Sequence, residues 1–263
     1  MAYEFILVEK REHLTVVTIN RPEVMNSLHP LAHRELDEVF NEFSEDSNSW
    51  VAILTATGDR AFCAGNDLRW QAQHGAEELK KSMESLKGGF AGISHRFNLF
   101  KPLIAAINGL ALGGGFETAL ACDIIIAADH ATFGLPEPRV GLMAGMGGVH
   151  RLPRHIPFHL AMGLELTGRH ITVQEAYRLG IVNEVVSLKD LMPTAERWAA
   201  DILACAPLAV RATKEATLKG LDLSLEVAMS KEFPGLETLR YSEDLIEGPK
   251  AFAEKRKPKW KGR

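Results

Sequence analysis

The sequence predicts an α/β protein that ends in a helical region. Short runs of apolar and β-branched residues alternate with helical patterns in the first part of the chain, whereas the last quarter carries helical patterns alone. Such alternation is typical of one layered domain, and 263 residues suffice for a large domain with a small addition. We therefore expect a core over residues 1–190 and a helical region over residues 191–263.

The first part of the chain predicts strands around one helix. Residues 3–9 and 14–20 are expected to pair as strands, because the second run is rich in β-branched residues. A helix is expected from about Pro30, where apolar residues recur at helical spacing, and residues 51–55 predict a buried strand. Residues 69–95 are polar and irregular, which indicates either a mobile excursion over a site or surface loop and helix.

Residues 101–148 combine apolar runs with two groups of glycines. An apolar run at 103–107 precedes three consecutive glycines, and a helical pattern follows at 116–122. Two carboxylates, Glu117 and Glu137, lie in these otherwise apolar segments. Ionised carboxylates are costly in buried surroundings unless they are paired or used, so these two are candidates for chemistry.

The triple glycine at residues 113–115 permits positive φ and close approach of a ligand to the main chain. Just before a helix, it leaves N–H groups free to bind a phosphate or a developing oxyanion. The phosphate motifs do not fit, because neither a P-loop nor a complete dinucleotide pattern is present. An oxyanion site beside Glu117 remains, although the pattern alone is more typical of a tight strand-to-helix turn with a solvated glutamate.

The second half predicts mostly helices. Residues 123–129 and 181–186 are its strand-like runs, and Thr172 with Glu175 forms a capping-box pattern between them. Helical patterns then continue from about residue 191 almost to the C-terminus. Their apolar faces follow a core that already has enough elements for a domain, so we expect these faces to be covered in a homo-oligomer.

Composition and charge exclude several classes of protein. A net charge of −4 gives no indication of nucleic acid or a membrane surface as a partner. The three cysteines lie far apart in the sequence and the histidines form no ligand-spaced cluster, so we expect neither disulfides nor a metal site. No secretory leader or membrane-spanning run is recognisable, and a cytoplasmic location is therefore expected.

A series of motifs extends through nearly the whole chain. They are Asn20-Arg21-Pro22-Glu23, residues 62–68, residues 107–123 with the triple glycine, residues 133–137, residues 141–153 and residues 242–256. In this order and spacing they resemble the enoyl-CoA hydratase/isomerase family, the crotonase superfamily. The resemblance implies a crotonase-like spiral of ββα units with a C-terminal helical trimerisation region, assembled as a trimer or a dimer of trimers. It also implies an acyl-CoA thioester substrate and no separate cofactor, because coenzyme A is part of the substrate.

The resemblance assigns site residues by matching positions. It implies that the backbone N–H groups of Asn66 and Gly114 hold the thioester oxygen, and that Glu117 and Glu137 are the two catalytic glutamates. The positions implied to contact the coenzyme A are Ala64, Asn66, Asp67, Leu68, Arg69 and Gly114, with Phe252 and Lys255, of the same or a neighbouring subunit, near its adenine. No metal site is implied.

These positions imply an enoyl-CoA hydratase, which adds water reversibly, in the syn sense, to a 2-enoyl-CoA of fatty acid or related acyl-CoA metabolism. A carnitinyl-CoA dehydratase-like activity is an alternative, because the tail and residues 113–137 also resemble that branch. An isomerase that moves the double bond from the 3,4 to the 2,3 position is a second alternative, but it needs only one carboxylate. A non-catalytic acyl-CoA- or RNA-binding relative would lack one glutamate or carry a strongly basic surface, and neither feature is present.

Overall fold

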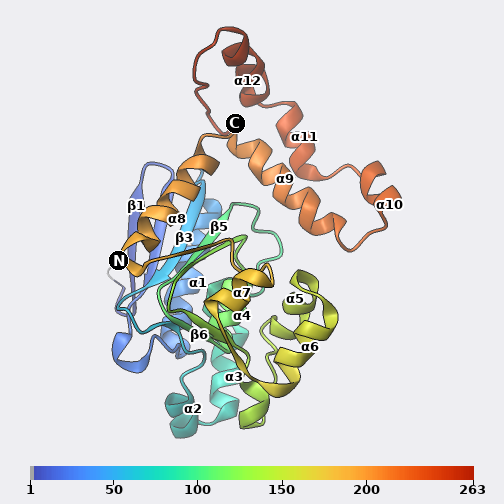
Figure 1. Ribbon diagram of the computed structural model, residues 1–263. Coiled ribbons are helices and arrows are strands. Elements are labelled where there is room, and N and C mark those ends of the chain that lie inside the picture. Colours follow the sequence, from blue (N-terminus) through green and yellow to red (C-terminus); the bar gives the residue numbers. More distant parts are fainter. Residues whose placement is uncertain (1–2) are drawn as a thin grey trace.

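The computed structural model describes residues 3–263, apart from the side chain of Ala76, and its centre is formed by two β-sheets (Figure 1). Within these residues the larger sheet has six strands in the order β1-β2-β3-β5-β7-β10, and the smaller sheet has four in the order β4-β6-β8-β9. The strands are β1 (Ile6–Arg11), β2 (Leu14–Ile19), β3 (Val51–Ala56), β4 (Ala61–Cys63), β5 (Leu103–Ile107), β6 (Leu110–Leu112), β7 (Ile124–Ala128), β8 (Thr132–Gly134), β9 (His170–Thr172) and β10 (Glu184–Val186).

Three successive strand pairs give the core its spiral form. In β3–β4, β5–β6 and β7–β8, the first strand joins the larger sheet and the second joins the smaller one. Neighbouring repeats pair in parallel, with Ile53 opposite Ile104 in the larger sheet and Ala111 opposite Phe133 in the smaller. The expected α/β fold built from repeated strand-strand-helix units is confirmed.

Helices cover both faces of the larger sheet, and its central strands are therefore buried on both sides. Since side chains alternate along a strand, Ile53 and Ile104 pack with α8, whereas Leu54 and Ala105 belong to the main core with α1 and α4. The helices are α1 (Pro30–Glu45), α2 (Leu68–His74), α3 (Ala76–Glu84), α4 (Gly114–Leu120), α5 (Gly148–His155), α6 (Phe158–Thr167), α7 (Val173–Arg178), α8 (Leu188–Leu203), α9 (Pro207–Gly220), α10 (Leu225–Ser230), α11 (Pro234–Arg240) and α12 (Glu243–Ala253). The short 3-10 helices are η1 (Pro22–Val24), η2 (Phe90–Gly92) and η3 (Glu137–Val140).

Residues 69–95 form α2 and α3, which lie at the surface, and then a loop whose residues 90–94 are buried. α2 begins here because the Asp67 carboxylate accepts a hydrogen bond from the Trp70 amide at 3.1 Å. Gly75 lies between α2 and α3 with φ +86°, a conformation that suits glycine. The predicted cap at Thr172 is confirmed as well, since its hydroxyl accepts from the Glu175 amide at 3.2 Å.

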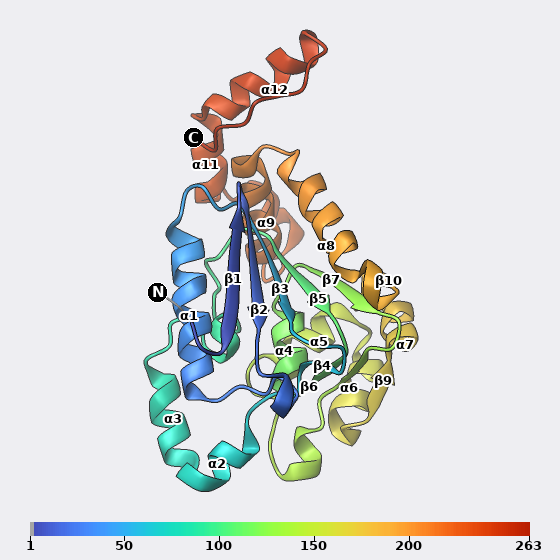
Figure 2. The same cartoon turned by 90° about the vertical axis from the view of Figure 1, so that its left-hand side faces the viewer.

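The last four helices project from the core (Figures 1 and 2). We call residues 207–263 the arm; in it α9 packs against α11, and α12 lies farthest from the smaller sheet. The boundary expected between residues 190 and 191 falls inside α8, which packs on the larger sheet through Leu191, Ala195 and Ala199. We therefore propose to divide core from arm after α8 instead. None of the helices in the described residues has the length and apolar character needed to cross a membrane.

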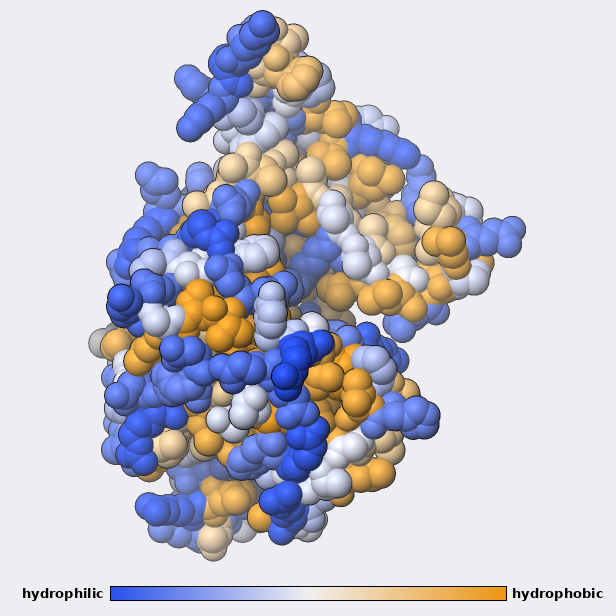
Figure 3. Space-filling view, viewed as in Figure 1, coloured by the Kyte–Doolittle hydropathy of each residue, from blue (hydrophilic) through white to orange (hydrophobic). Residues whose placement is uncertain are grey.

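Large apolar side chains lie on the surface of the arm, as Figure 3 shows for the face turned to the viewer. Leu225, Met229, Tyr241 and Phe252 are each more than three-quarters exposed. A monomer rarely leaves so many large apolar side chains in water. The arm therefore has the surface of an element that is incomplete by itself.

Candidate active site

The ends of β4 and β6 bring two glycine-containing segments together, residues 63–68 and 112–117, which we call the seam. The two strands are parallel neighbours, so both segments leave the smaller sheet at the same edge. At Gly65, with φ +93°, an added Cβ would lie 3.0 Å from the Leu112 carbonyl oxygen and 3.1 Å from the Gly114 nitrogen. Only glycine fits this close approach, which explains the glycine at the end of the β4 segment.

Two backbone amides of the seam are left without partners. Among the described residues, no acceptor lies within hydrogen-bonding range of the N–H of Asn66 or of Gly114. The Asn66 side chain is occupied elsewhere, since it donates to Gln71 at 2.8 Å. An unpaired amide in a buried segment is uncommon, because it costs the free energy of a lost hydrogen bond. Two of them side by side can bind one oxygen atom.

Glu117 lies in the first turn of α4 and is only 2% exposed. Its Oε1 accepts a hydrogen bond from the Gly148 amide at 2.8 Å, at the start of α5. The pKa of Glu117 is raised to about 7, chiefly by burial and in smaller part by the negative charge of Glu137, while the Gly148 amide acts in the opposite direction. At neutral pH this carboxyl group therefore exchanges protons readily.

Glu137 is the first residue of η3, and its side chain reaches the same seam at Gly113. Its Oε1 lies 3.0 Å from the place that a Cβ on Gly113 would occupy. Its Oε2 is buried and has no hydrogen-bond partner among the described residues. Burial raises the pKa of this carboxyl group too. The structure therefore brings Glu117 and Glu137 to the seam that also contains the two free amides.

The aromatic ring of Phe90 forms a wall of the seam that sequence reasoning missed. A Cβ added to Gly114 would lie 2.3 Å from Phe90 Cζ, so the ring rests directly on this glycine. Two buried polar residues of α1 hold the loop that carries it. The Ala91 amide donates to His33 Nδ1 at 3.1 Å, and the Gly88 amide donates to Asp37 Oδ1 at 2.7 Å.

The two residues that hold the Phe90 loop, His33 and Asp37, are recognisable in the sequence as polar residues among apolar ones. His33 and Asp37 are four residues apart, and both fall on the face of α1 that is otherwise apolar. Burial lowers the pKa of His33 to about 3, so its imidazole is neutral and its Nδ1 can accept the hydrogen bond from the Ala91 amide. Buried polar residues in an apolar helical face indicate a specific partner, here the backbone of the Phe90 loop.

The residues expected along the coenzyme A have different surroundings. Leu68 and Arg69 are exposed in the first turn of α2, and Ala64 is half-buried with its amide bonded to the Met25 carbonyl. The Asp67 carboxylate instead points inward and pairs with Arg21 at 3.2 Å. Of these four residues, the side chains of Leu68 and Arg69 are the ones available to a ligand outside the core.

Phe252 and Lys255 are not brought to the seam within one chain. Phe252 is 87% exposed at the end of α12, and Lys255 follows it in the arm. In both ribbon views α12 lies at one end of the molecule and α2, which begins at the seam, lies at the other (Figures 1 and 2). Within one chain, α12 therefore lies far from the seam.

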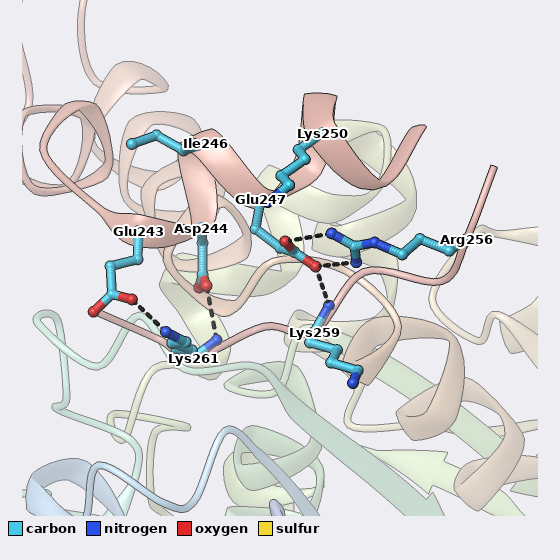
Figure 4. A pocket seen from close by; sticks show the side chains of 8 residues that line it. All are labelled: Glu243, Asp244, Ile246, Glu247, Lys250, Arg256, Lys259 and Lys261. Atoms are coloured by element: carbon cyan, nitrogen blue, oxygen red, sulfur yellow. Dashed lines mark hydrogen bonds and ion pairs between the residues drawn. The ribbon is translucent and has the colours of Figure 1, made fainter. Parts of the chain in front are cut away.

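A pocket of about 460 Å³ lies in the arm, between α12 and the chain that returns beside it (Figure 4). Its carboxylates are already used: Glu247 pairs with Arg256 at 2.5 Å, Glu243 pairs with Lys261 at 2.5 Å, and Asp244 accepts the amide of Lys261 at 2.7 Å. Because these bonds attach the tail to α12, we assign the pocket to the fold of the arm. It contains neither predicted glutamate.

Cys63 ends β4 within the seam, but it has no nucleophilic character. Its side chain is fully buried, and burial raises the pKa of the thiol to about 12. The thiolate is the reactive form of cysteine. The buried, protonated thiol is therefore not a candidate nucleophile.

Comparison with known proteins identifies the family. Residues 9–263 match the family model for enoyl-CoA hydratase/isomerase. The chain is 44% identical over 251 residues to a carnitinyl-CoA dehydratase of Proteus mirabilis and 43% identical over 254 residues to one of Escherichia coli K12, covering 94% of each chain in both cases. The crystal structure of an enoyl-CoA hydratase from Bacillus anthracis superposes with a TM-score of 0.92 at 38% identity, over 99% of this chain and 100% of that one.

A second solved structure, the enoyl-CoA hydratase from Mycobacterium tuberculosis H37Rv, gives a TM-score of 0.90 at 38% identity, over 98% of this chain and 99% of that one. Matches of this extent cover both the spiral core and the arm. The resemblance that the motifs indicated is confirmed: the chain belongs to the enoyl-CoA hydratase/isomerase family and has its crotonase fold.

Proposed function

We propose that this protein is an enoyl-CoA hydratase, which adds water reversibly to a 2-enoyl-CoA thioester. One observation carries the proposal: two free amides and two buried carboxyl groups meet at the same seam. Relatives named as enoyl-CoA hydratases and carnitinyl-CoA dehydratases support this reaction class.

The free amides of Asn66 and Gly114 are suited to the charge that this reaction creates. When water attacks Cβ of the conjugated thioester, negative charge accumulates on the carbonyl oxygen. Two fixed N–H groups stabilise that charge without reorganising, and loss of one such donor typically costs ~3 kcal/mol of barrier. The ring of Phe90 against Gly114 excludes water from one side of this oxygen, which strengthens both hydrogen bonds.

Glu117 and Glu137 are suited to the two proton transfers. One carboxylate must accept a proton from the attacking water, and one carboxylic acid must donate a proton to Cα. Burial raises the pKa of both groups, and their mutual repulsion opposes ionisation of the second. Such a pair retains one proton near neutral pH, so it contains one base and one acid.

A second candidate is dehydration of a carnitinyl-CoA-like substrate. It is favoured by the 43–44% identity to carnitinyl-CoA dehydratases over 94% of the chain. The same two carboxyl groups and two amides serve this reaction, because dehydration is hydration in reverse. The two candidates differ in the acyl group, which carries a trimethylammonium group in the second case.

We further propose that coenzyme A extends along residues 64–69 and that its adenine meets Phe252 and Lys255 of a neighbouring copy. The distance between α12 and the seam within one chain supports a contribution from another subunit. Trimeric or hexameric assembly, a cytoplasmic location and the absence of a separate cofactor are parts of the same proposal.

The test is a panel of thioesters. Purified protein is incubated with 2-enoyl-CoA and 3-enoyl-CoA substrates of increasing length, and with a 2-butenoyl-CoA that bears a trimethylammonium group. Loss of the conjugated absorbance of the 2-enoyl thioesters supports hydration, and a strong preference for the cationic substrate supports the second candidate. Formation of conjugation from 3-enoyl-CoA alone indicates an isomerase, and no change with any thioester contradicts the proposal.

A further inference from the structure

The turn at residues 20–28 contains the first motif of the sequence, yet it contributes no group to the chemistry above. Two of its residues, Met25 and Asn26, have positive φ values of +57° and +55°. Such values are uncommon for residues other than glycine and persist where the surroundings enforce them. Here the Asn26 amide group donates to the carbonyls of Thr57 at 3.0 Å and Ala61 at 2.7 Å. The turn is thereby fixed to the beginning of β4.

From this turn, two hydrogen bonds in series lead to the seam. Leu28 donates its N–H to the Gly65 carbonyl at 2.9 Å. The Gly65 carbonyl and the Asn66 N–H belong to one planar peptide group and point in opposite directions. By holding the carbonyl, Leu28 therefore fixes the direction of the free Asn66 N–H.

Arg21 stands at the head of the same series. Its guanidinium donates to the Ser27 carbonyl, which shares a peptide group with the Leu28 N–H. The order is thus guanidinium, peptide 27–28, peptide 65–66 and the open oxyanion position. Hydrogen bonds in such a chain polarise one another, by roughly 10–30% per bond. A positive charge at its head makes the last N–H a stronger donor.

The position of Arg21 is enforced by Asp67. The two side chains are buried, each 11% exposed, and Asp67 Oδ2 lies 3.2 Å from Arg21 Nη2. The other carboxylate oxygen, Oδ1, caps α2 through the Trp70 amide. A buried ion pair contributes little net stability, because desolvation of both charges offsets their attraction. An ion pair at this place next to the seam therefore indicates that Asp67 serves to position the Arg21 guanidinium.

We propose that Arg21, held by Asp67, is a positioning residue for the oxyanion hole, which orients and polarises the Asn66 N–H through two consecutive peptide groups. The inference rests on the proposed function, since it assumes that the Asn66 N–H receives a thioester oxygen. Arg21 itself does not touch the substrate in this arrangement.

Three variants separate the contributions. Arg21→Met removes the charge and its hydrogen bonds, whereas Arg21→Lys keeps the charge and is expected to recover part of the function. Asp67→Asn breaks the ion pair but can still cap α2, because asparagine is a good N-cap residue. Lys214→Met is the control, since Lys214 pairs with Asp123 at 2.6 Å in a partly buried site between α9 and the larger sheet.

The readout is the carbonyl stretching frequency of bound butanoyl-CoA labelled with ¹³C at the thioester carbon, a ligand that cannot be hydrated. We expect its shift to lower wavenumber in the wild-type protein, a smaller shift in Arg21→Met and Asp67→Asn, and a full shift in Lys214→Met. With a 2-enoyl-CoA, kcat should fall roughly 10- to 100-fold in Arg21→Met, less than for loss of a whole donor. KM should change less than about threefold, since ground-state binding is retained.

A wild-type carbonyl shift and native kcat in Arg21→Met would overturn the inference. If Arg21→Met does not fold, Asp67→Asn decides. A reduced carbonyl shift in this variant supports the positioning role of Arg21, and a full shift contradicts it. Failure of the proposed function is a separate result, because the wild-type protein would then leave every 2-enoyl-CoA unchanged, whatever the variants do to the bound butanoyl-CoA.

Discussion

The seam and the arm differ in which side chains they bury and which they expose. At the seam, Glu117 is buried and held by the Gly148 amide, and Glu137 is half-buried with one buried oxygen that has no partner among the described residues. Two backbone amides beside them are free. In the arm, charged side chains pair with one another at the surface while large apolar side chains remain exposed. The groups of the proposed chemistry therefore all come from one chain, whereas the arm has an apolar surface that we propose a neighbouring copy covers.

The largest effect is expected from the carboxyl groups of the seam. Glu117→Gln and Glu137→Gln should each lower kcat roughly 10³-fold, because positioned general acids and bases contribute about 10²- to 10⁴-fold. Each variant should keep the fold, which circular dichroism checks. The matched control is Glu165→Gln in α6, whose Oε1 is also buried without a partner but lies outside the seam. Near-native turnover in either seam variant, measured with all hydrated thioesters, would show that two carboxyl groups are not needed.

The next effect distinguishes the main chain of the seam from its side chains. Gly114→Val should lower kcat roughly 100-fold, because its Cβ would collide with Phe90 beside the oxyanion position. Asn66→Ala should keep most of the activity, since its backbone N–H remains. Steady-state kinetics on the best 2-enoyl-CoA checks both variants. Equal and severe losses in two folded proteins would instead assign the function of Asn66 to its side chain.

A smaller effect is expected in the arm. Light scattering at low micromolar concentration should give the mass of at least a trimer. Met229→Asp and Ile246→Asp should lower that mass, because each side chain is more than 70% exposed in the single chain and a charge is costly once a partner buries it. Lys189→Asp, on the exposed side of α8, is the control that should leave the mass unchanged. A wild-type monomer with full activity would disprove any contact of Phe252 with a neighbour's ligand.

The smallest effect concerns pH and stability. The pKa of Glu117 is raised from 4.5 to about 7 in the folded protein, so folding favours its protonated form. The contribution of this group is present in full below pH 4.5 and is lost as pH rises through about 7. Urea unfolding at pH 5 and pH 8 should therefore show a larger loss of stability in the wild-type protein than in Glu117→Gln. An identical pH dependence would mean that Glu117 is not held in a buried environment.

The sequence was most informative where residues conflict with their surroundings. Glu117 and Glu137 were recognisable because carboxylates are unusual in apolar, glycine-rich segments, and the structure places both at the seam. The wall formed by Phe90 was missed because it depends on contacts with α1, more than fifty residues away in the sequence. A propensity pattern contains no information on such pairs.

The arm shows a different limit of prediction. Its helices were expected from their apolar spacing, and they are present. The boundary expected at residue 190 falls inside α8, because that helix shows apolar residues at helical spacing like the helices of the arm but packs on the sheet. Arg21 was visible as part of a motif, yet the hydrogen bonds that connect it to the Asn66 peptide group depend on the backbone of the folded turn.

The central claim is that two carboxyl groups on one side of the substrate perform both proton transfers. It is tested most directly by hydrating (E)-2-butenoyl-CoA in D₂O and determining the relative configuration at Cα and Cβ of the product from its proton NMR coupling constants. The account predicts a single diastereomer in which the hydroxyl group and the deuteron have entered from the same face. A product of opposite-face addition, or a mixture of the two diastereomers, would contradict it.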